Sequence, residues 1–172
     1  MAEIQKEVLF KIGYGVYIVS ASADGKDNGQ IANVVFQVTA EPAKIAICIN
    51  KDNLTYEIIK KSGFFGVSII EEETPMTFIG TFGFKSGRDI DKYEKIDFKR
   101  TENGVPLVKD FSVGIMEMKV VGELDSGSHT LFVGELISSE VLKDSPPMTY
   151  AYYHEVKKGK SPKTAPTFVG NM

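Results

Sequence analysis

Cysteine, histidine and tryptophan are scarce in this chain of 172 residues, which has one cysteine, two histidines and no tryptophan. The single cysteine, Cys48, excludes a disulfide framework within the chain and also excludes zinc or iron–sulfur sites built on several cysteines. His129 and His154 lie far apart and lack the short spacing of paired metal ligands. The sequence therefore predicts no metal site.

Long apolar runs are also missing, since no segment approaches the roughly 18 residues that a transmembrane helix needs. The first ten residues, MAEIQKEVLF, are too polar for a secretory signal. The formal net charge is −3, and no long basic stripe precedes the C-terminal tail, so nucleic acid is not an indicated partner. We expect a cytoplasmic protein that binds neither nucleic acid nor membrane.

The common nucleotide-binding motifs are incomplete. Gly13-Tyr14-Gly15 resembles the start of a dinucleotide fingerprint, but Ile18 replaces the third glycine and a strand follows where a helix is needed. Lys85-Ser86 resembles the end of a phosphate-binding P-loop, but Phe84 and Ile79 stand where that loop requires glycine. These departures argue against both a Rossmann fold and a P-loop enzyme.

Segments rich in β-branched and apolar residues predict six or seven strands, connected mostly by short links. The polar cluster 24–29 predicts a hairpin loop longer than the tight two-residue kind. Short links between strands are typical of an antiparallel barrel and not of alternating βαβ units. The predicted strands cover residues 16–23, 30–39, 44–50, 64–70, 112–124 and 130–142.

Two short helices are predicted between these strands. Asn53 can cap the first, which runs to Lys61 and is closed by Gly63. The second begins with a Thr74 cap and Pro75 at the first helical position, runs to about residue 82 and ends at Gly83. A polar, glycine-containing loop spans residues 84–95.

Five segments, in order along almost the full chain, together resemble the flavin reductase family of FMN-binding split-barrel proteins. Two come from the N-terminal half, GYGVYIVSA with NGQIANVVFQVTAEP, and CINKDNLTYEII with GFFGVSII. The others are FGFKSGRDIDKY, GSHTLFVGEL and TYAYYHEVKKGKSPKTAPTF. The last segment is similar to the branch of ferric reductases, flavoredoxins and high-molecular-weight rubredoxins.

This resemblance implies a mainly β, antiparallel split barrel at residues 1–156, followed by a basic tail at 157–172. It implies FMN at a homodimer interface and a hydride taken from NADH or NADPH. The acceptor would be a free flavin, a ferric chelate or a redox protein such as rubredoxin. Neither that acceptor nor the choice between NADH and NADPH follows from the sequence.

Phosphate-binding residues are expected in two places. Asn53 and Thr55 stand at a predicted helix start, where N–H groups and the helix dipole favour an anion, although Asn53 could merely cap the helix. The loop Ser86-Gly87-Arg88 to Lys92 supplies a hydroxyl, a flexible glycine and two cations, although a solvated loop would look the same. The resemblance favours Lys92 and Ser86, while Arg88 could instead pair with Asp89 or Asp91.

In the second predicted strand Asn33 and Gln37 share an orientation and Phe36 faces the other way. Asn33 could be a hydrogen-bonded amide of an edge strand, but the resemblance implies that these residues contact the flavin, mostly through the backbone near the edge of the ring. Cys48 reads as a small buried hydrophobe, yet the resemblance puts it near the flavin. A lone histidine in a turn is commonly structural, but the resemblance of the HTLF segment favours a His129 that donates a proton or stabilises negative charge on the reduced ring. The complete set that the resemblance implies for the cofactor is Gln30, Asn33, Val34, Phe36, Gln37, Asn50, Asn53, Thr55, Ser86, Gly87, Arg88, Lys92, His129 and Phe168, with His129 and Cys48 as catalytic candidates.

Two other functions stay open at this point. One is an electron carrier of the flavoredoxin kind, in which a partner protein reduces tightly held FMN without nicotinamide activity. The other is a barrel that only stores or senses a flavin. The tail lysines 157, 158, 160 and 163 could meet an NADP phosphate or an acidic redox partner, or simply be solvated.

Overall fold

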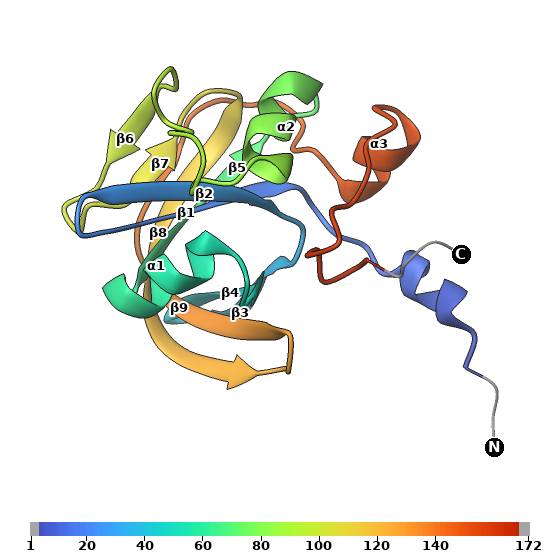
Figure 1. The fold of residues 1–172 in the computed structure, drawn as a ribbon, viewed down its shortest axis with the longest axis horizontal. Coiled ribbons are helices and arrows are strands. Elements are labelled where there is room, and N and C mark those ends of the chain that lie inside the picture. Colours follow the sequence, from blue (N-terminus) through green and yellow to red (C-terminus); the bar gives the residue numbers. More distant parts are fainter. Residues whose placement is uncertain (1–3, 169–172) are drawn as a thin grey trace.

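A computed structural model describes residues 4–168 and shows a mainly β protein flanked by short helices (Figure 1). No helix in this part of the chain is long and apolar enough to cross a membrane. The helical elements are η1 (Lys6–Lys11), α1 (Leu54–Ser62), α2 (Met76–Phe84) and α3 (Tyr150–Glu155). The strands are β1 (Tyr17–Ala23), β2 (Lys26–Ala32), β3 (Val35–Ala40), β4 (Ala43–Asn50), β5 (Phe64–Ile70), β6 (Phe98–Arg100), β7 (Pro106–Val108), β8 (Ser112–Asp125) and β9 (His129–Val141).

Seven strands form one antiparallel sheet in the order β2-β1-β5-β8-β9-β4-β3. β2 and β3 are the two edges of this order, yet only residues 33 and 34 separate them in the chain. So short a link spans at most roughly 11 Å from Ala32 to Val35, at about 3.6 Å per residue. The sheet must therefore curl until its edges approach each other, and the Cys48 N–H of β4 donates to the Val34 carbonyl at that point, at 3.2 Å.

The prediction of a single strand over residues 30–39 is therefore wrong. β2 ends at Ala32, Asn33 lies in a bend, and β3 pairs with β4 instead of β1. The long loop predicted at 24–29 is also wrong. Asp24 and Gly25 form a tight turn with φ of 50° and 75°, and pairing resumes at Lys26. Two left-handed residues match the twist of a hairpin, which explains why asparagine, aspartate and glycine are favoured there.

The helix boundaries are only partly as predicted. α1 ends at Gly63, whose φ of 74° is the left-handed conformation that glycine adopts most readily. Asn53 occupies the N-cap position of α1 but its side chain makes no capping hydrogen bond. In α2 the N-cap position belongs to Pro75, and the Thr74 hydroxyl donates to the Glu71 carbonyl. Gly83 lies inside α2, which continues to Phe84.

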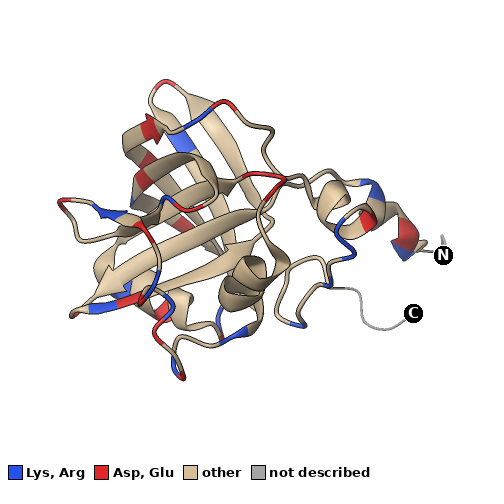
Figure 2. Ribbon diagram, turned by 90° about the horizontal axis from the view of Figure 1, so that it is seen from above, with Lys and Arg blue, Asp and Glu red and all other residues tan. Residues whose placement is uncertain are grey.

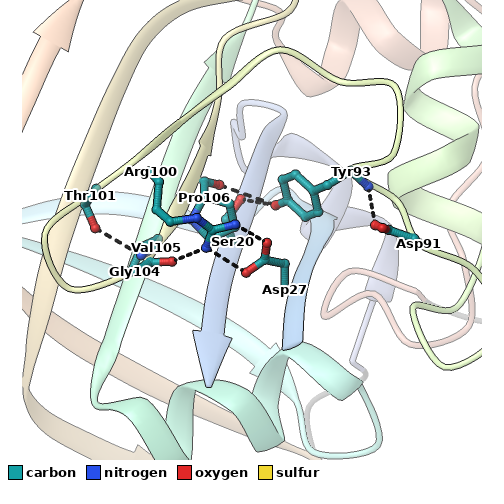
Figure 3. A network of polar contacts seen from close by, with 9 residues as sticks. All are labelled: Ser20, Asp27, Asp91, Tyr93, Arg100, Thr101, Gly104, Val105 and Pro106. Atoms are coloured by element: carbon teal, nitrogen blue, oxygen red, sulfur yellow. Dashed lines mark hydrogen bonds and ion pairs between the residues drawn. The ribbon is translucent and has the colours of Figure 1, made fainter. Parts of the chain in front are cut away.

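The sequence did not predict η1, α3 or the small β6–β7 hairpin. This hairpin is tied to the main sheet by polar contacts (Figure 3). Arg100 at the end of β6 donates to both carboxylate oxygens of Asp27 in β2, at 3.0 and 2.5 Å. The buried Tyr93 hydroxyl donates to Ser20 in β1 at 2.7 Å. These contacts fix the loop after α2, which also carries Lys92.

Two apolar clusters form most of the core. One fills the curl of the sheet under α1 and includes Phe65, Met118 and Phe132. The other joins α2 and α3 to the ends of β1 and β5, with Phe82 and Tyr153 among its members. A cavity opens beside the second cluster, between β2, α1, α2 and residues 160–166.

Candidate flavin site

The cavity has a volume of about 310 Å³, within the range of small-molecule sites. Its walls come from β2, the end of β4, the start of α1, the end of α2 with the following loop, α3, and residues 160–166. Of the predicted cofactor residues, the lining contains Gln30, Asn33, Asn50, Asn53, Thr55, Ser86, Gly87, Arg88 and Lys92, and it also contains Cys48. Val34, Phe36, Gln37, His129 and Phe168 lie outside it.

Lys92 is a buried cation, with 6% of its surface exposed. Its ammonium group donates to the carbonyls of Gly29, at 2.8 Å, and Phe82, at 3.2 Å. No carboxylate in the described residues forms an ion pair with it. Burial lowers the pKa of Lys92 to about 8. An ammonium group has three donors, so one remains for an anion in the cavity, which would also compensate the buried charge.

The start of α1 forms the second part of this anion-binding wall. A helix of nine residues leaves N–H groups of its first turn without intrahelical partners, and these favour an anion. Thr55 in this turn is fully buried and accepts a hydrogen bond from Asn28 Nδ2 at 2.8 Å. Asn28 therefore keeps its oxygen directed away from Thr55.

Two buried acceptor atoms in the cavity wall have no partner in the described structure, Asn28 Oδ1 and Gln30 Oε1. A buried acceptor without a donor costs about 1–3 kcal/mol, so these atoms fit a ligand that carries hydroxyl or N–H donors. Gly87 passes so close to Asn28 that a Cβ there would lie 2.0 Å from Oδ1. The lining thus combines donors for an anion with acceptors for hydroxyl or N–H groups, as the phosphate, ribityl chain and ring of FMN require.

The loop after α2 contributes Ser86 and Arg88. Ser86 Oγ accepts from the Arg88 N–H at 3.1 Å and so shapes the turn. The Arg88 side chain pairs with Glu57 of α1 and not with Asp89 or Asp91. It therefore fastens the loop to α1 while lining the cavity.

Cys48 and His129, the catalytic candidates, lie in different surroundings. Cys48 lines the cavity from β4, and burial raises the pKa of its thiol. His129, the first residue of β9, contacts Ser128 Oγ through Nδ1 at 2.9 Å and the Thr164 carbonyl through Nε2 at 3.1 Å. His129 thus holds the C-terminal segment that lines the cavity.

Three predicted residues lie on exposed surface. Phe36, 48% exposed, and Gln37 belong to the edge strand β3, and the Gln37 amide donates to the Thr39 carbonyl. Gln37 was expected to share an orientation with Asn33, but the two do not lie in one strand. Asn33 lies in the bend between β2 and β3, is buried, and donates to Thr167 Oγ1 at 2.8 Å. Phe168 is 37% exposed, and its N–H donates to the Ala165 carbonyl.

Sequence reasoning missed several cavity residues. Asn28 was placed in a turn, although it lies in β2 and faces Thr55. Residues 157–168, which we call the basic strap, were read as a tail, yet six of them line the cavity. Tyr150 holds the strap through Ser161 and through Thr167 Oγ1, the latter at 3.1 Å. The clustering of tyrosines at 150–153 was the available signal for this packing.

Comparison with known proteins identifies the family of this chain. The sequence profile of the flavin reductase like domain matches residues 9–160. The chain belongs to the flavin reductase family. It is 51% identical to a ferric-chelate reductase (NAD(P)H) of Archaeoglobus fulgidus over 94% of this chain and 96% of that protein. It is 45% identical to a high molecular weight rubredoxin of Moorella thermoacetica, over 94% of this chain and 71% of the relative.

Solved structures show the same fold. The NADH:FAD oxidoreductase of Streptomyces globisporus superposes with a TM-score of 0.77 at 21% identity, covering 88% of this chain and 94% of the other. Flavoredoxin from Methanosarcina acetivorans gives 0.73 at 25% identity, covering 86% and 80%. The resemblance inferred from five sequence segments is confirmed, and so is the assignment to the flavin-dependent oxidoreductases.

Proposed function

We propose that the protein holds FMN in this cavity, takes hydride from NADH or NADPH, and passes electrons to a flavin, a ferric chelate or a redox protein. The observation that carries the proposal is a cavity lining that contains both the buried Lys92 and two acceptor atoms without partners in the described structure, Asn28 Oδ1 and Gln30 Oε1. The name of the Archaeoglobus relative supports NAD(P)H as the donor and a ferric chelate as an acceptor, and the name of the Moorella relative supports a redox protein as an acceptor. When bound, FMN supplies hydride acceptance and release of one or two electrons.

Lys92, the first turn of α1 and the loop at Ser86-Gly87-Arg88 would hold the phosphate. Because Lys92 is so deeply buried, it suits a terminal phosphate better than the diphosphate of FAD, which continues into an adenosine that needs further room. Asn28 and Gln30 would accept hydrogen bonds from the ribityl hydroxyls or the ring N–H. FMN binding stronger than FAD or riboflavin binding in a titration supports this choice, and equal binding of all three contradicts it.

The remaining predicted contacts with the cofactor are Asn33, Val34, Phe36, Gln37, Asn50 and Phe168. Cys48 would lie beside the flavin as a neutral thiol, because its pKa is raised. The proton-donating role of His129 stays a prediction, since Nε2 would first have to leave the Thr164 carbonyl.

We also propose that the curled sheet is a split barrel and that the protein works as a cytoplasmic homodimer. The two-residue link between edge strands supports the barrel. Exposed apolar side chains support the dimer, among them Val38 of β3 and Leu124 of β8, at 46% and 62% exposure. Light scattering at several concentrations tests the dimer, and a monomer mass throughout rejects it.

A carrier that lacks nicotinamide activity is the second candidate, favoured by the likeness to Methanosarcina flavoredoxin. Rapid mixing of the FMN-loaded protein with NADPH and NADH separates the two functions. Loss of the oxidised flavin band with either nucleotide supports the reductase. An unchanged band, together with rapid reduction by a protein donor such as ferredoxin, supports the carrier.

A further inference from the structure

The basic strap, residues 157–168, has an unusual charge. It contains four lysines and no acidic residue in a chain whose net charge is −3, and Figure 2 shows it without red segments. Lys158, Lys160 and Lys163 are exposed. No ion pair joins them to an acidic side chain of the described residues. A positive patch of this kind on an acidic protein attracts negatively charged partners.

Six strap residues line the cavity, Lys160 among them, so the strap lies beside the proposed flavin site. The lining contains two exposed lysines, Lys160 of the strap and Lys85 of the segment after α2. The lining also includes Phe84, the chain neighbour of Lys85, whose surface is 54% exposed. An exposed aromatic residue with charged neighbours is the composition of a protein interface, in which an apolar centre has a polar rim.

The strap is held in a defined conformation. The Tyr153 hydroxyl donates to the Lys160 carbonyl at 2.9 Å, and His154 Nδ1 contacts the Gly159 carbonyl at 2.8 Å. Lys158 has a φ of 57°, in the left-handed region where a residue with a side chain is disfavoured. Glycine adopts this φ more readily, so Lys158→Gly would remove the charge without straining the backbone.

From these observations we infer that the strap lysines and Phe84 form the docking surface for a small acidic redox protein that accepts electrons from the flavin. This inference rests on the proposed function. The charges would raise the rate at which the partner meets the cavity opening, an effect that falls with salt. Each docking event would transfer one electron from the reduced flavin to the partner's oxidised one-electron centre, so two partner molecules would return the flavin to its oxidised form.

The test uses the FMN-loaded full chain, reduced with dithionite under argon and freed of excess reductant, so that nicotinamide activity does not enter the measurement. Stopped-flow mixing with oxidised rubredoxin as the probe gives the second-order rate constant. Salt is varied from about 10 mM to about 1 M, over which the Debye length falls from roughly 30 to 3 Å. Failure of FMN to bind would appear in the starting spectrum and would count against the proposed function instead.

Three variants make the measurement specific. Replacement of Lys158, Lys160 and Lys163 by glutamate should slow the reaction at least tenfold at low salt, with rates converging at high salt. The control replaces Lys26, Lys95 and Lys119 by glutamate, which changes the net charge equally at exposed positions outside the cavity lining, and should stay within about twofold of wild type. The variant Lys158→Gly should react more slowly than the wild type. Its melting temperature should equal or exceed that of the wild type, because glycine relieves the strain at this φ.

Equal rates for the two triple variants would overturn the inference. The inference would also be overturned if the strap triple variant lost as much rate with ferric EDTA as with rubredoxin, since the lysines would then attract any small anion. A defect confined to reduction by NADPH, measured separately, would assign the lysines to the nucleotide phosphate and would also overturn it.

Discussion

Replacing Lys92 by methionine removes the ammonium group and keeps most of the apolar side chain. If Lys92 donates to the FMN phosphate, the variant loses a hydrogen bond between charged groups, which is worth about 1.5–3 kcal/mol. That loss raises the dissociation constant roughly 10- to 150-fold, at 1.4 kcal/mol per tenfold change. Riboflavin lacks the phosphate, so its affinity should be unchanged.

The pH dependence gives a second, independent signature. Without ligand the pKa of Lys92 is about 8, and a bound phosphate would raise it, so FMN binding takes up a proton above pH 8. Affinity should therefore be highest below pH 8 and fall by up to about tenfold per pH unit above it. In Lys92→Met this fall should vanish.

The same shift affects the stability of the ligand-free protein. Between pH 8 and 10.5 the unfolded chain binds more protons than the folded one at Lys92, so stability rises with pH. A shift from 10.5 to about 8 corresponds to about 3 kcal/mol. Urea unfolding should show this rise in wild type relative to Lys92→Met. At pH 7 burial of the charge costs that amount until an anion binds.

Fluorescence titration with FMN and riboflavin measures these affinities, and Lys95→Met serves as the matched control, because Lys95 is exposed and lies outside the cavity lining. Equal loss of FMN and riboflavin binding in Lys92→Met would mean that Lys92 supports the fold of the cavity and not the phosphate. Unchanged FMN binding would remove Lys92 from the site.

Three further variants or reactions test the cavity. Gly87→Ala should weaken FMN binding more than about tenfold, because the added Cβ would lie 2.0 Å from Asn28 Oδ1. Gly80→Ala is the control, because a Cβ there would have no atom within 4 Å; it should stabilise α2 by about 0.5–1 kcal/mol and leave FMN binding unchanged. Equal FMN titration curves for the two variants would contradict this prediction. His129→Ala should leave FMN bound and slow flavin reduction by NAD(P)H, and equal stopped-flow rates would refute it. Cys48 should react slowly with iodoacetamide at pH 8 and faster above pH 9, as its raised pKa requires, and FMN should protect it; rapid alkylation at pH 8 would show a thiolate.

The sequence predicted well where one local signal decides the structure. Strand β5 and helix α1 follow from apolar periodicity and from the left-handed Gly63 that ends the helix. The predicted strands at 112–124 and 130–142 correspond to β8 and β9. The prediction of one strand over residues 30–39 was wrong because their composition favours β structure throughout. The break at Asn33 depends on the curl of the sheet, which long-range strand pairing sets.

The site was predictable for residues that a family motif contains and less so for the others. Lys92 and Thr55 belong to such motifs and lie in the cavity wall. Asn28 was missed because its role depends on a contact with Thr55, 27 residues away. The strap was read as a tail because its hydrogen bonds to Asn33, His129 and Tyr150 join distant parts of the chain.

An anaerobic absorbance spectrum of the FMN-reconstituted protein, recorded before and after addition of NADPH or NADH, tests the central claim most directly. The account predicts that FMN binds and that its visible band bleaches with at least one nucleotide, then returns when an acceptor is added. FMN that binds but stays oxidised would contradict the reductase and leave the carrier. Absence of FMN binding would contradict the assignment of the cavity itself.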